Sequence, residues 1–567
     1  MIKSLFAIAL LITIPVFASE SFSFLSGDMI DQNFQNNDHI FSNHHSNIIN
    51  FNEPTNDQQL KRYLIFGKGS SSELGNIKTD YSISSSNGFF SIVIIPENTI
   101  SIFQSKGFSV IEDFQLDFHS KYISKDNVSQ ISTIGNIANS ERVHSLYNVT
   151  GKDVKIAIID TGVDFSNPDI QHALARDNEN IPIMLDPDGQ GLILTNATFA
   201  ANIDEYGTIK NFTKPAKYNT TSNVYVKSRA DGVFLNINQN GDGTSLLVYN
   251  SMFPMFGNTP LLNGTLNDDM KIGKDKHNYI ESKSGIYHLG VMFQGTPRQP
   301  QVVPVLVTDS KISGIYDTII PDMSTSWQDF INTSENDQPN FDFDFTDDIE
   351  HVIGDGNEFL VYDYDEDGKF DYSAGTLGAQ VLDIYGVIEN ESNIDKNFGA
   401  VNGTLLPPLD HKGEFFGVMT DVQGHGTSSA GTIISKGLQE YDIYNDTKKY
   451  HIKGIAPDAK IIPVKALWFG DILYAWLWSA GFDNDDVQWN FSGNTRADII
   501  SNSWGVSTFP NFEYAPGFDL LSLMMTTLSI PGSYTEDYPG VLMISSAGNS
   551  GHGYGTIGLP NASPTGI

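Results

Sequence analysis

Long apolar runs with little alternation mark the second half of the chain and one stretch before it. They lie at 154–159 ("VKIAII"), 459–467 ("AKIIPVKAL"), 496–505 ("RADIISNSWG") and 539–549 ("PGVLMISSAGN"). Such runs are typical of strands that are buried on both faces of a parallel sheet. Residues 518–530 have helical periodicity, so strands and helices alternate. The pattern predicts an α/β fold, an open parallel sheet with helices on both faces, whose ligands bind at the carboxyl ends of the strands.

A different pattern precedes these runs. Residues 59–121 contain two apolar segments, a helix-like segment that begins at Pro96 and Glu97, and a third apolar segment, "SVIEDFQLDF". Two strands, a helix and another strand predict a small α+β module. Residues 19–58 are polar and rich in asparagine, a composition that favours a flexible segment.

The first residues carry a targeting pattern. Lys3 comes before an apolar run from Leu5 to Phe17, and a polar sequence begins after Ala18. This arrangement predicts a secretory signal peptide over residues 1–18, and therefore a secreted, extracellular protein. The alternative, a retained membrane anchor, would need roughly 20 apolar residues to cross a bilayer. No later segment of the sequence is apolar enough to span a membrane.

Composition narrows the class of protein. The 567 residues are enough for two or three buried cores, and a hydrophobic content of 40% excludes a disordered chain. A formal net charge of -35 would repel a phosphate backbone over most of the surface, which excludes nucleic acid as the main partner. The chain has no cysteine, so we expect its stability outside the cell to come from core size and bound ions.

Three polar residues follow or flank the predicted strands. Asp160 directly follows the first run, His425 lies between two glycines at the start of a helix, and Asn549 is the last residue of the fourth run. Each has an ordinary explanation when taken alone, since aspartate forms turns and a histidine beside glycines is a common loop residue. Together, a carboxylate, an imidazole and an amide donor at strand ends form most of an acyl-transfer site.

The motifs around these residues are "AIIDTGVD", "GHGTSSAG" and "SSAGNSG", and their order resembles that of the subtilisin-like serine peptidases. "GIAPDAKIIPVKAL" and "ISNSWG" resemble linking strands of the same fold, so residues 140–174 and 411–567 are expected to form two parts of a catalytic domain. The resemblance implies that Asp160 orients the imidazole, His425 is the general base and later the acid, and Asn549 binds the oxyanion. The strand that pairs with an extended polypeptide substrate falls at Ser503, Trp504 and Gly505.

The module at 59–121 gains a role from its position. Subtilisin-like enzymes commonly carry a small α+β propeptide between signal peptide and catalytic domain, which assists folding and blocks the active-site cleft. The module is similar in size and order, so the resemblance implies that it is the propeptide and an inhibitor of its own enzyme. An unrelated small domain is the alternative.

The resemblance is interrupted by a long segment. Asp160 and His425 stand 265 positions apart, whereas the simplest family members need only a few tens. Residues 175–410 are therefore expected to be an insertion, and their β-prone runs between Gly, Asn and Asp turns predict a mostly β domain. The insertion resembles that of the family branch with tripeptidyl-peptidase II and pyrolysin.

An acidic motif, "DYDEDGKFD", lies inside the insertion. Alternating carboxylates before a glycine converge on one centre, and hard oxygen ligands select calcium, so we predict a structural Ca²⁺ site. A solvated acidic loop is the alternative. A second candidate is "DPDGQG", with Asp186 and Asp188. The predicted ligands of the first site are Asp363, Asp365, Asp367 and Asp371.

The sequence departs from the family where the nucleophile belongs. No Gly-Thr-Ser follows Asn549, and the Gly243-Thr244-Ser245 triplet comes before His425, so we interpret Ser245 as a decoy. We expect the chain to be the N-terminal part of a longer secreted serine endopeptidase or tripeptidyl peptidase, inactive by itself. Attachment to a cell surface through a further C-terminal part stays open. The alternative function is a non-catalytic cell-surface protein that keeps the fold for binding.

Overall fold

The computed structural model shows two compact units, one of residues 1–161 with 428–567 and one of residues 162–427. Within the described residues, no helix combines the length and apolar character that crossing a membrane requires. The described residues are 60–68, 74, 79–85, 88–113, 138–187, 189, 191–195, 197–203, 209–213, 224–227, 231–237, 244–250, 262–266, 282–296, 299–323, 345, 348–362, 372–383, 404–421, 423–442, 449–467, 469–484, 489–505, 517, 519–549 and 557–567.

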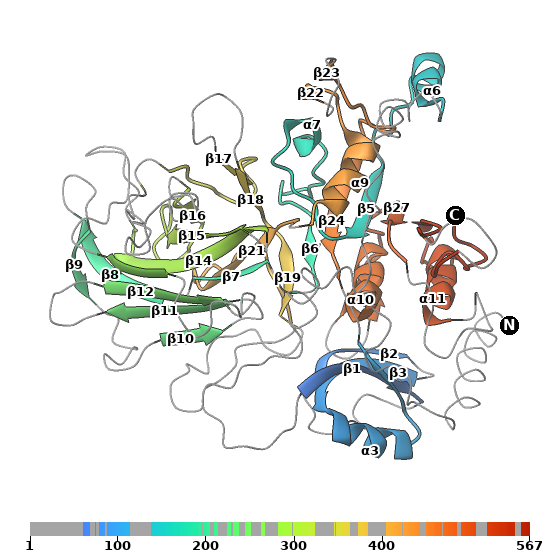
Figure 1. The fold of residues 1–567 in the computed structure, drawn as a ribbon, viewed down its shortest axis with the longest axis horizontal. Coiled ribbons are helices and arrows are strands. Elements are labelled where there is room, and N and C mark those ends of the chain that lie inside the picture. Colours follow the sequence, from blue (N-terminus) through green and yellow to red (C-terminus); the bar gives the residue numbers. More distant parts are fainter. Residues whose placement is uncertain are drawn as a thin grey trace, which may run out of the picture. The chain divides into compact units, whose positions relative to one another are not determined.

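Parallel strands form the central sheet of the first unit (Figure 1). Each corresponds to one of the apolar runs: β5 (Lys155–Asp160), β24 (Lys460–Lys465), β27 (Ile499–Asn502) and β28 (Leu542–Ser545). They pair in the order β24-β5-β27-β28, and all three pairings are parallel. Ile156, Ala157, Ile158 and Ile159 are all buried, as expected of a strand that is covered on both faces. The predicted α/β fold with a parallel sheet is confirmed.

Helices accompany this sheet. They are α6 (Ser140–Tyr147), α9 (His425–Ile434), α10 (Phe469–Ser479) and α11 (Leu520–Ser529). Asp519 caps α11 by accepting the Ser522 N–H at 2.9 Å, which satisfies one free donor of the first turn. All 11 residues of α10 are buried, so this helix lacks a polar face. Short antiparallel pairs are formed by β22 (Tyr441–Asp442) with β23 (Lys449–Tyr450), and by β25 (Phe482–Asn484) with β26 (Trp489–Phe491).

A four-stranded antiparallel sheet with one helix forms the N-terminal α+β module. Its elements are β1 (Leu60–Gly67), β2 (Thr79–Ser85), β3 (Gly88–Pro96), the short 3₁₀ helix η2 (Glu97–Thr99), α3 (Ile100–Ser105) and β4 (Ser109–Glu112). The strand order is β2-β3-β1-β4, and α3 covers one face, where Phe103 joins the core with Tyr63 and Val93 (Figure 1). Strand β2 was not predicted, because an edge strand needs only a few apolar residues and its sequence is mostly polar.

A buried ion-pair network joins this module to helix α10. The Nη2 atom of Arg62 lies 2.7 Å from Oδ1 of Asp471, and its Nε atom lies 3.2 Å from Oδ2 of Asp113. The N–H of Gly470 donates to Oδ1 of Asp113 at 3.2 Å. The side chain of Arg62 is 2% exposed and both carboxylates are 0% exposed, so three charges are held away from water.

The second unit is built mostly from antiparallel sheets in its described residues. Strands β10 (Val224–Lys227), β11 (Asp231–Ile237), β12 (Thr244–Asn250) and β13 (Leu262–Leu266) pair in chain order. A second sheet has the order β16-β15-β14-β8-β9, with β8 (Ala197–Ile203), β9 (Ile209–Thr213), β14 (Ile286–Thr296), β15 (Gln299–Thr308) and β16 (Thr318–Pro321).

A third sheet carries the chain back toward His425. Its order is β17-β18-β21-β7, with β7 (Leu192–Leu194), β17 (Phe359–Tyr362), β18 (Tyr372–Leu377) and β21 (Phe415–Met419). Strand β19 (Gln380–Asp383) pairs in parallel with β6 (Leu185–Asp186) and antiparallel with β20 (Thr404–Leu406). The one-turn helix α7 (Pro168–Gln171) is capped by Asn167, whose side chain accepts the Asp169 N–H.

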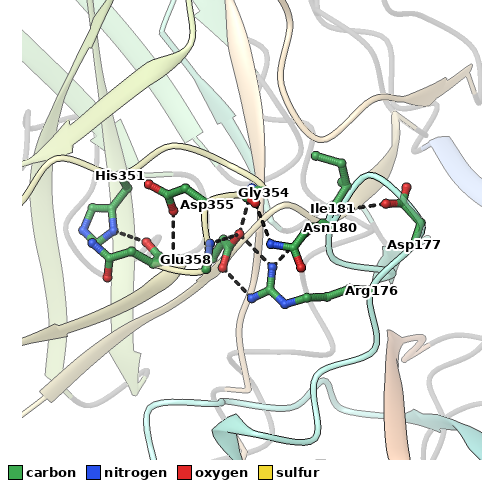
Figure 2. Close-up of polar contacts among 10 residues, drawn as sticks. Arg176, Asp177, Asn180, Ile181, His351, Gly354, Asp355 and Glu358 are labelled. Carbon is green, nitrogen blue, oxygen red and sulfur yellow. Dashed lines mark hydrogen bonds and ion pairs between the residues drawn. The ribbon is translucent and has the colours of Figure 1, made fainter. Parts of the chain in front are cut away.

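A polar cluster fastens the start of the predicted insertion to a later loop, as Figure 2 shows. Arg176 forms two parallel hydrogen bonds with Glu358, at 2.9 and 2.6 Å, and also donates to the carbonyl of Asn180. The Gly354 N–H donates to the same carboxylate at 2.8 Å. Burial raises the pKa of Glu358, but Arg176 and the backbone donors outweigh it, so the pKa lies below its ordinary value.

Candidate active site

Asp160 is the last residue of β5 and is completely buried. The Thr161 N–H donates to Oδ1 of its carboxylate at 2.8 Å, and its own carbonyl accepts the Ala466 N–H at 3.0 Å. A buried carboxylate needs hydrogen bonds to its oxygens, and the bond from the Thr161 N–H also helps to fix its direction. Asp160 thus stands where the sequence predicted it, at the carboxyl end of a parallel strand.

The turn after Asp160 lies against the segment that leads to His425. Gly162 has φ +104, and a Cβ atom there would stand 2.1 Å from the carbonyl oxygen of Thr420. Any side chain would therefore clash with backbone, as well as meet an unfavourable φ. The Asp-Thr-Gly sequence allows this close approach, five residues before His425.

His425 begins helix α9, directly after Gly424 at φ +78. The carboxylate of Asp421 accepts the N–H of Gly424 at 2.8 Å and the N–H of Thr427 at 2.8 Å. These bonds satisfy donors at the helix start that have no partner within the helix, and they place a negative charge at its positive end. The orientation of the first turn, and with it the Cα–Cβ direction of His425, is set by Asp421.

The hydroxyl of Thr427 connects this helix start to the Asp160 loop. Its Oγ1 accepts the N–H of Asp164 at 2.9 Å and donates to Oδ2 of Asp421 at 2.6 Å. Asp164 is four residues after Asp160, and Thr427 is two residues after His425. The chain segments that follow Asp160 and surround His425 are therefore hydrogen-bonded to each other within the second unit.

The carboxylate of Asp164 forms a further contact of this region. Its Oδ1 accepts the Ser166 N–H and the Ser373 hydroxyl, each at 2.9 Å. Burial raises the pKa of Asp164 above its ordinary value and the charge of Asp421 adds to this, while the bonds from Ser166 and Ser373 oppose it. Sequence reasoning missed Asp164, Asp421, Thr427 and Ser373. The first three had a signal in the sequence: Asp164 is the second aspartate of "DTGVD", and Asp421 and Thr427 are the first and last residues of "DVQGHGT".

Asn549 lies in a bend after β28 and is exposed. Gly548 before it has φ +87, and the Ser546 N–H donates to the carbonyl of Asn502 at 3.0 Å, so the strand pairing continues briefly past β28. The predicted role of Asn549 at the oxyanion stays a prediction.

Ser503, Trp504 and Gly505 follow directly after β27. The indole of Trp504 is 2% exposed and stacks on Trp476 of α10, with ring centroids 6.0 Å apart. Ser503 and Gly505 are partly exposed on either side of it. Trp504 therefore anchors the segment through its buried indole, and the pairing of residues 503–505 with an extended substrate stays a prediction.

The predicted calcium ligands Asp363, Asp365, Asp367 and Asp371 lie outside the described residues, as does Asp188. Asp186 is completely buried, and its carboxylate accepts the N–H groups of Gly189 and Gly191, as a turn-forming aspartate does. Within the part of the chain that the structure describes, no group of three or more His, Asp or Glu side chains is placed to hold a metal.

Ser245 lies in β12, where its neighbours in the antiparallel ladder are Asn236 and Thr265. A strand, rather than the small-residue helix of the family pattern, follows this Gly-Thr-Ser triplet. This placement differs from that of a subtilisin-like nucleophile.

Comparison with known proteins adds to this geometry. Residues 416–567 match the model of the subtilase family. This part of the chain is therefore similar to the subtilases. The matched subtilase region contains His425, Asn549 and the segment 503–505, while Asp160 precedes it.

A further similarity extends over most of the chain. The chain is 24% identical over 454 residues to pyrolysin of Pyrococcus furiosus, an alignment that covers 74% of this chain and 25% of pyrolysin. The aligned chain thus spans about a quarter of the length of that relative. No solved structure matches the chain significantly. The subtilase match and the similarity to pyrolysin support a serine peptidase.

Proposed function

We propose that the protein is a secreted subtilisin-like serine endopeptidase that hydrolyses peptide bonds by an Asp-His-Ser mechanism. The observation that carries the proposal is the hydrogen-bonded meeting of two segments, the one after Asp160 and the one around His425. A general base and its orienting acid must act together, and this connection joins the segment after the acid to the segment around the base.

The roles follow from the chemistry of each side chain. His425 removes the proton of the attacking serine and later gives it to the leaving amine, while Asp160 selects the tautomer and stabilises the imidazolium. The amide of Asn549 donates to the oxyanion of the tetrahedral intermediate. We propose that the nucleophilic serine lies in another part of the full-length protein, because Ser245 lies in a strand and the aligned chain spans about a quarter of pyrolysin.

The α+β module is the proposed propeptide and inhibitor of the enzyme. Support comes from its attachment to α10 through Arg62, Asp113 and Asp471, and from its place before the catalytic part in the chain. Cleavage between the module and α6 would turn an intramolecular contact into a separable complex. Calcium, held by Asp363, Asp365, Asp367 and Asp371, is proposed as a structural ion. Chelation should lower the melting temperature of the wild type and not of an Asp365→Asn, Asp367→Asn variant.

The test is hydrolysis of a fluorogenic peptide library by the full-length secreted protein. We expect turnover by the wild type, a loss of about 10⁴-fold or more in kcat for His425→Ala, and normal turnover for His451→Ala. His451 is the matched control, since its side chain is 54% exposed and lies outside the candidate site. A folded wild type without turnover would favour the non-catalytic binding protein, and equal activity of His425→Ala would refute the proposed base.

A further inference from the structure

A serine of the predicted insertion is hydrogen-bonded to the loop that follows Asp160. Ser373 is in β18, inside residues 175–410, and its hydroxyl donates to Oδ1 of Asp164 at 2.9 Å. The hydroxyl oxygen of Ser373 also accepts the Gly375 N–H at 3.0 Å. Because Gly375 occupies a lone pair of the hydroxyl, the proton of Ser373 is left to point at the carboxylate.

A second contact brings the same strand against the segment that precedes His425. A Cβ atom on Gly375 would stand 2.4 Å from the Met419 carbonyl oxygen and 2.9 Å from Cγ2 of Thr420. Strand β18 also pairs with β21 through Thr376 and Met419. The approach of the insertion to this segment is therefore close over several residues, and the hydrogen bond from Ser373 comes from a paired strand.

The hydrogen bonds form a continuous series that we name the brace: Ser373, Asp164, Thr427 and Asp421. Ser373 holds the carboxylate of Asp164, the N–H of Asp164 holds the hydroxyl of Thr427, and Thr427 donates to Asp421. Asp421 in turn binds the N–H groups of the first turn of α9. Each bond restrains the next, so loss of the first loosens the helix start that carries His425.

We propose that the insertion is a working part of the active site, in which Ser373 is a positioning residue that holds His425 through the brace. The inference rests on the proposed function, in which His425 is the general base. In this proposal the insertion helps to position the general base, and Ser373 is the residue through which it does so. Ser373 touches neither substrate nor reacting atoms in this account.

The decisive variants remove one hydroxyl at a time from the full-length protein. Ser373→Ala should lower kcat about tenfold with KM within about twofold of wild type, because a misplaced base affects the transition state and not ground-state binding. Ser373→Thr, which keeps the hydroxyl, should restore most of the activity. Thr427→Val removes the hydroxyl that bonds Asp164 and Asp421, and therefore breaks the brace at the helix. This variant is the one to test if Ser373→Ala does not fold. The double variant should resemble the more severe single variant, since both act on one series of bonds.

Ser282→Ala is the matched control, because Ser282 also donates to a buried aspartate, Asp309, in the same unit. It should leave kcat unchanged. Equal kcat for wild type and Ser373→Ala, strictly additive effects in the double variant, or an equal loss in Ser282→Ala would overturn the positioning role.

A second readout does not depend on turnover. Modification of His425 by diethyl pyrocarbonate, followed by mass spectrometry, reports the environment of the imidazole. Ser373→Ala should alter the rate at His425 and leave that of the exposed His451 unchanged. A wild type that hydrolyses no peptide would count against the proposed function alone, whereas unaltered labelling of His425 in Ser373→Ala would count against the brace.

Discussion

Replacing Arg62 with methionine should destabilise the first unit strongly, because it leaves two buried carboxylates without their cation. Asp113 and Asp471 are both 0% exposed, and Arg62 contacts them at 3.2 and 2.7 Å. Methionine keeps most of the length and apolar volume of the arginine stem, so the change removes charge more than packing. The two carboxylates would then repel each other in a site that excludes water.

The size of the effect follows from the cost of breaking a buried pair. Removing one partner costs about 3–5 kcal/mol, since the other charge stays buried and uncompensated. Replacing the whole set by neutral groups costs less, because it also removes the desolvation penalty. The triple variant Arg62→Met, Asp113→Asn, Asp471→Asn should therefore be more stable than Arg62→Met alone.

Urea unfolding, followed by tryptophan fluorescence, measures this directly. Trp476 and Trp478 are buried on α10, the helix that Arg62 contacts through Asp471, so their emission reports the opening of this region. Lys311→Met is the matched control: the ammonium lies 3.7 Å from Asp317 on a side chain that is 63% exposed. A surface pair of this kind contributes about 0–1 kcal/mol.

Two results would refute this prediction. A loss below about 1 kcal/mol in Arg62→Met would mean that the network is no stronger than a surface pair. A triple variant less stable than Arg62→Met would mean that the carboxylates stabilise the fold through other contacts.

Three more predictions follow from the site and its surroundings. Glu358→Gln should lower the melting temperature at neutral pH. Because the folded pKa of Glu358 lies below its ordinary 4.5, this difference from wild type should shrink as the pH falls below about 4.5. A difference that stays constant in a pH series of melting curves would refute this. Gly162→Ala should reduce both stability and kcat. Gly314 has φ +79 and open space around it, so the control variant Gly314→Ala should cost only about 1 kcal/mol in stability. Equal effects of the two variants in thermal melts and turnover assays would contradict the close approach of Gly162 to Thr420. Asn549→Ala should lower kcat about 10²–10³-fold at unchanged KM in steady-state kinetics, and a higher KM at normal kcat would remove it from the oxyanion site.

The parallel sheet was readable from the sequence because burial on both faces leaves unbroken apolar runs. Asp160 and His425 were readable because each sits beside glycines that the backbone requires, Gly162 and Gly424. Helix α10 was not readable, since a helix buried on all sides has no periodicity to detect.

The long-range polar contacts of the fold were beyond sequence reasoning for a physical reason. Arg62 and Asp471 are 409 positions apart, and Ser373 and Asp164 are 209 apart. Such pairs are set by how strands and loops pack, and nothing in the local pattern around Ser373 marks it among many serines. Propensity and periodicity report a residue's own element, and say little about distant partners.

The central claim is that Asp160 and His425 serve a serine nucleophile that follows Asn549 in the complete protein. A fluorophosphonate probe, which labels only activated serines, tests this claim when it is applied to the full-length protein and the label is located by mass spectrometry. The account predicts one labelled serine on the C-terminal side of Asn549, with labelling lost in His425→Ala and kept in Ser245→Ala. Labelling at Ser245, or a folded protein that takes no label at all, would contradict it.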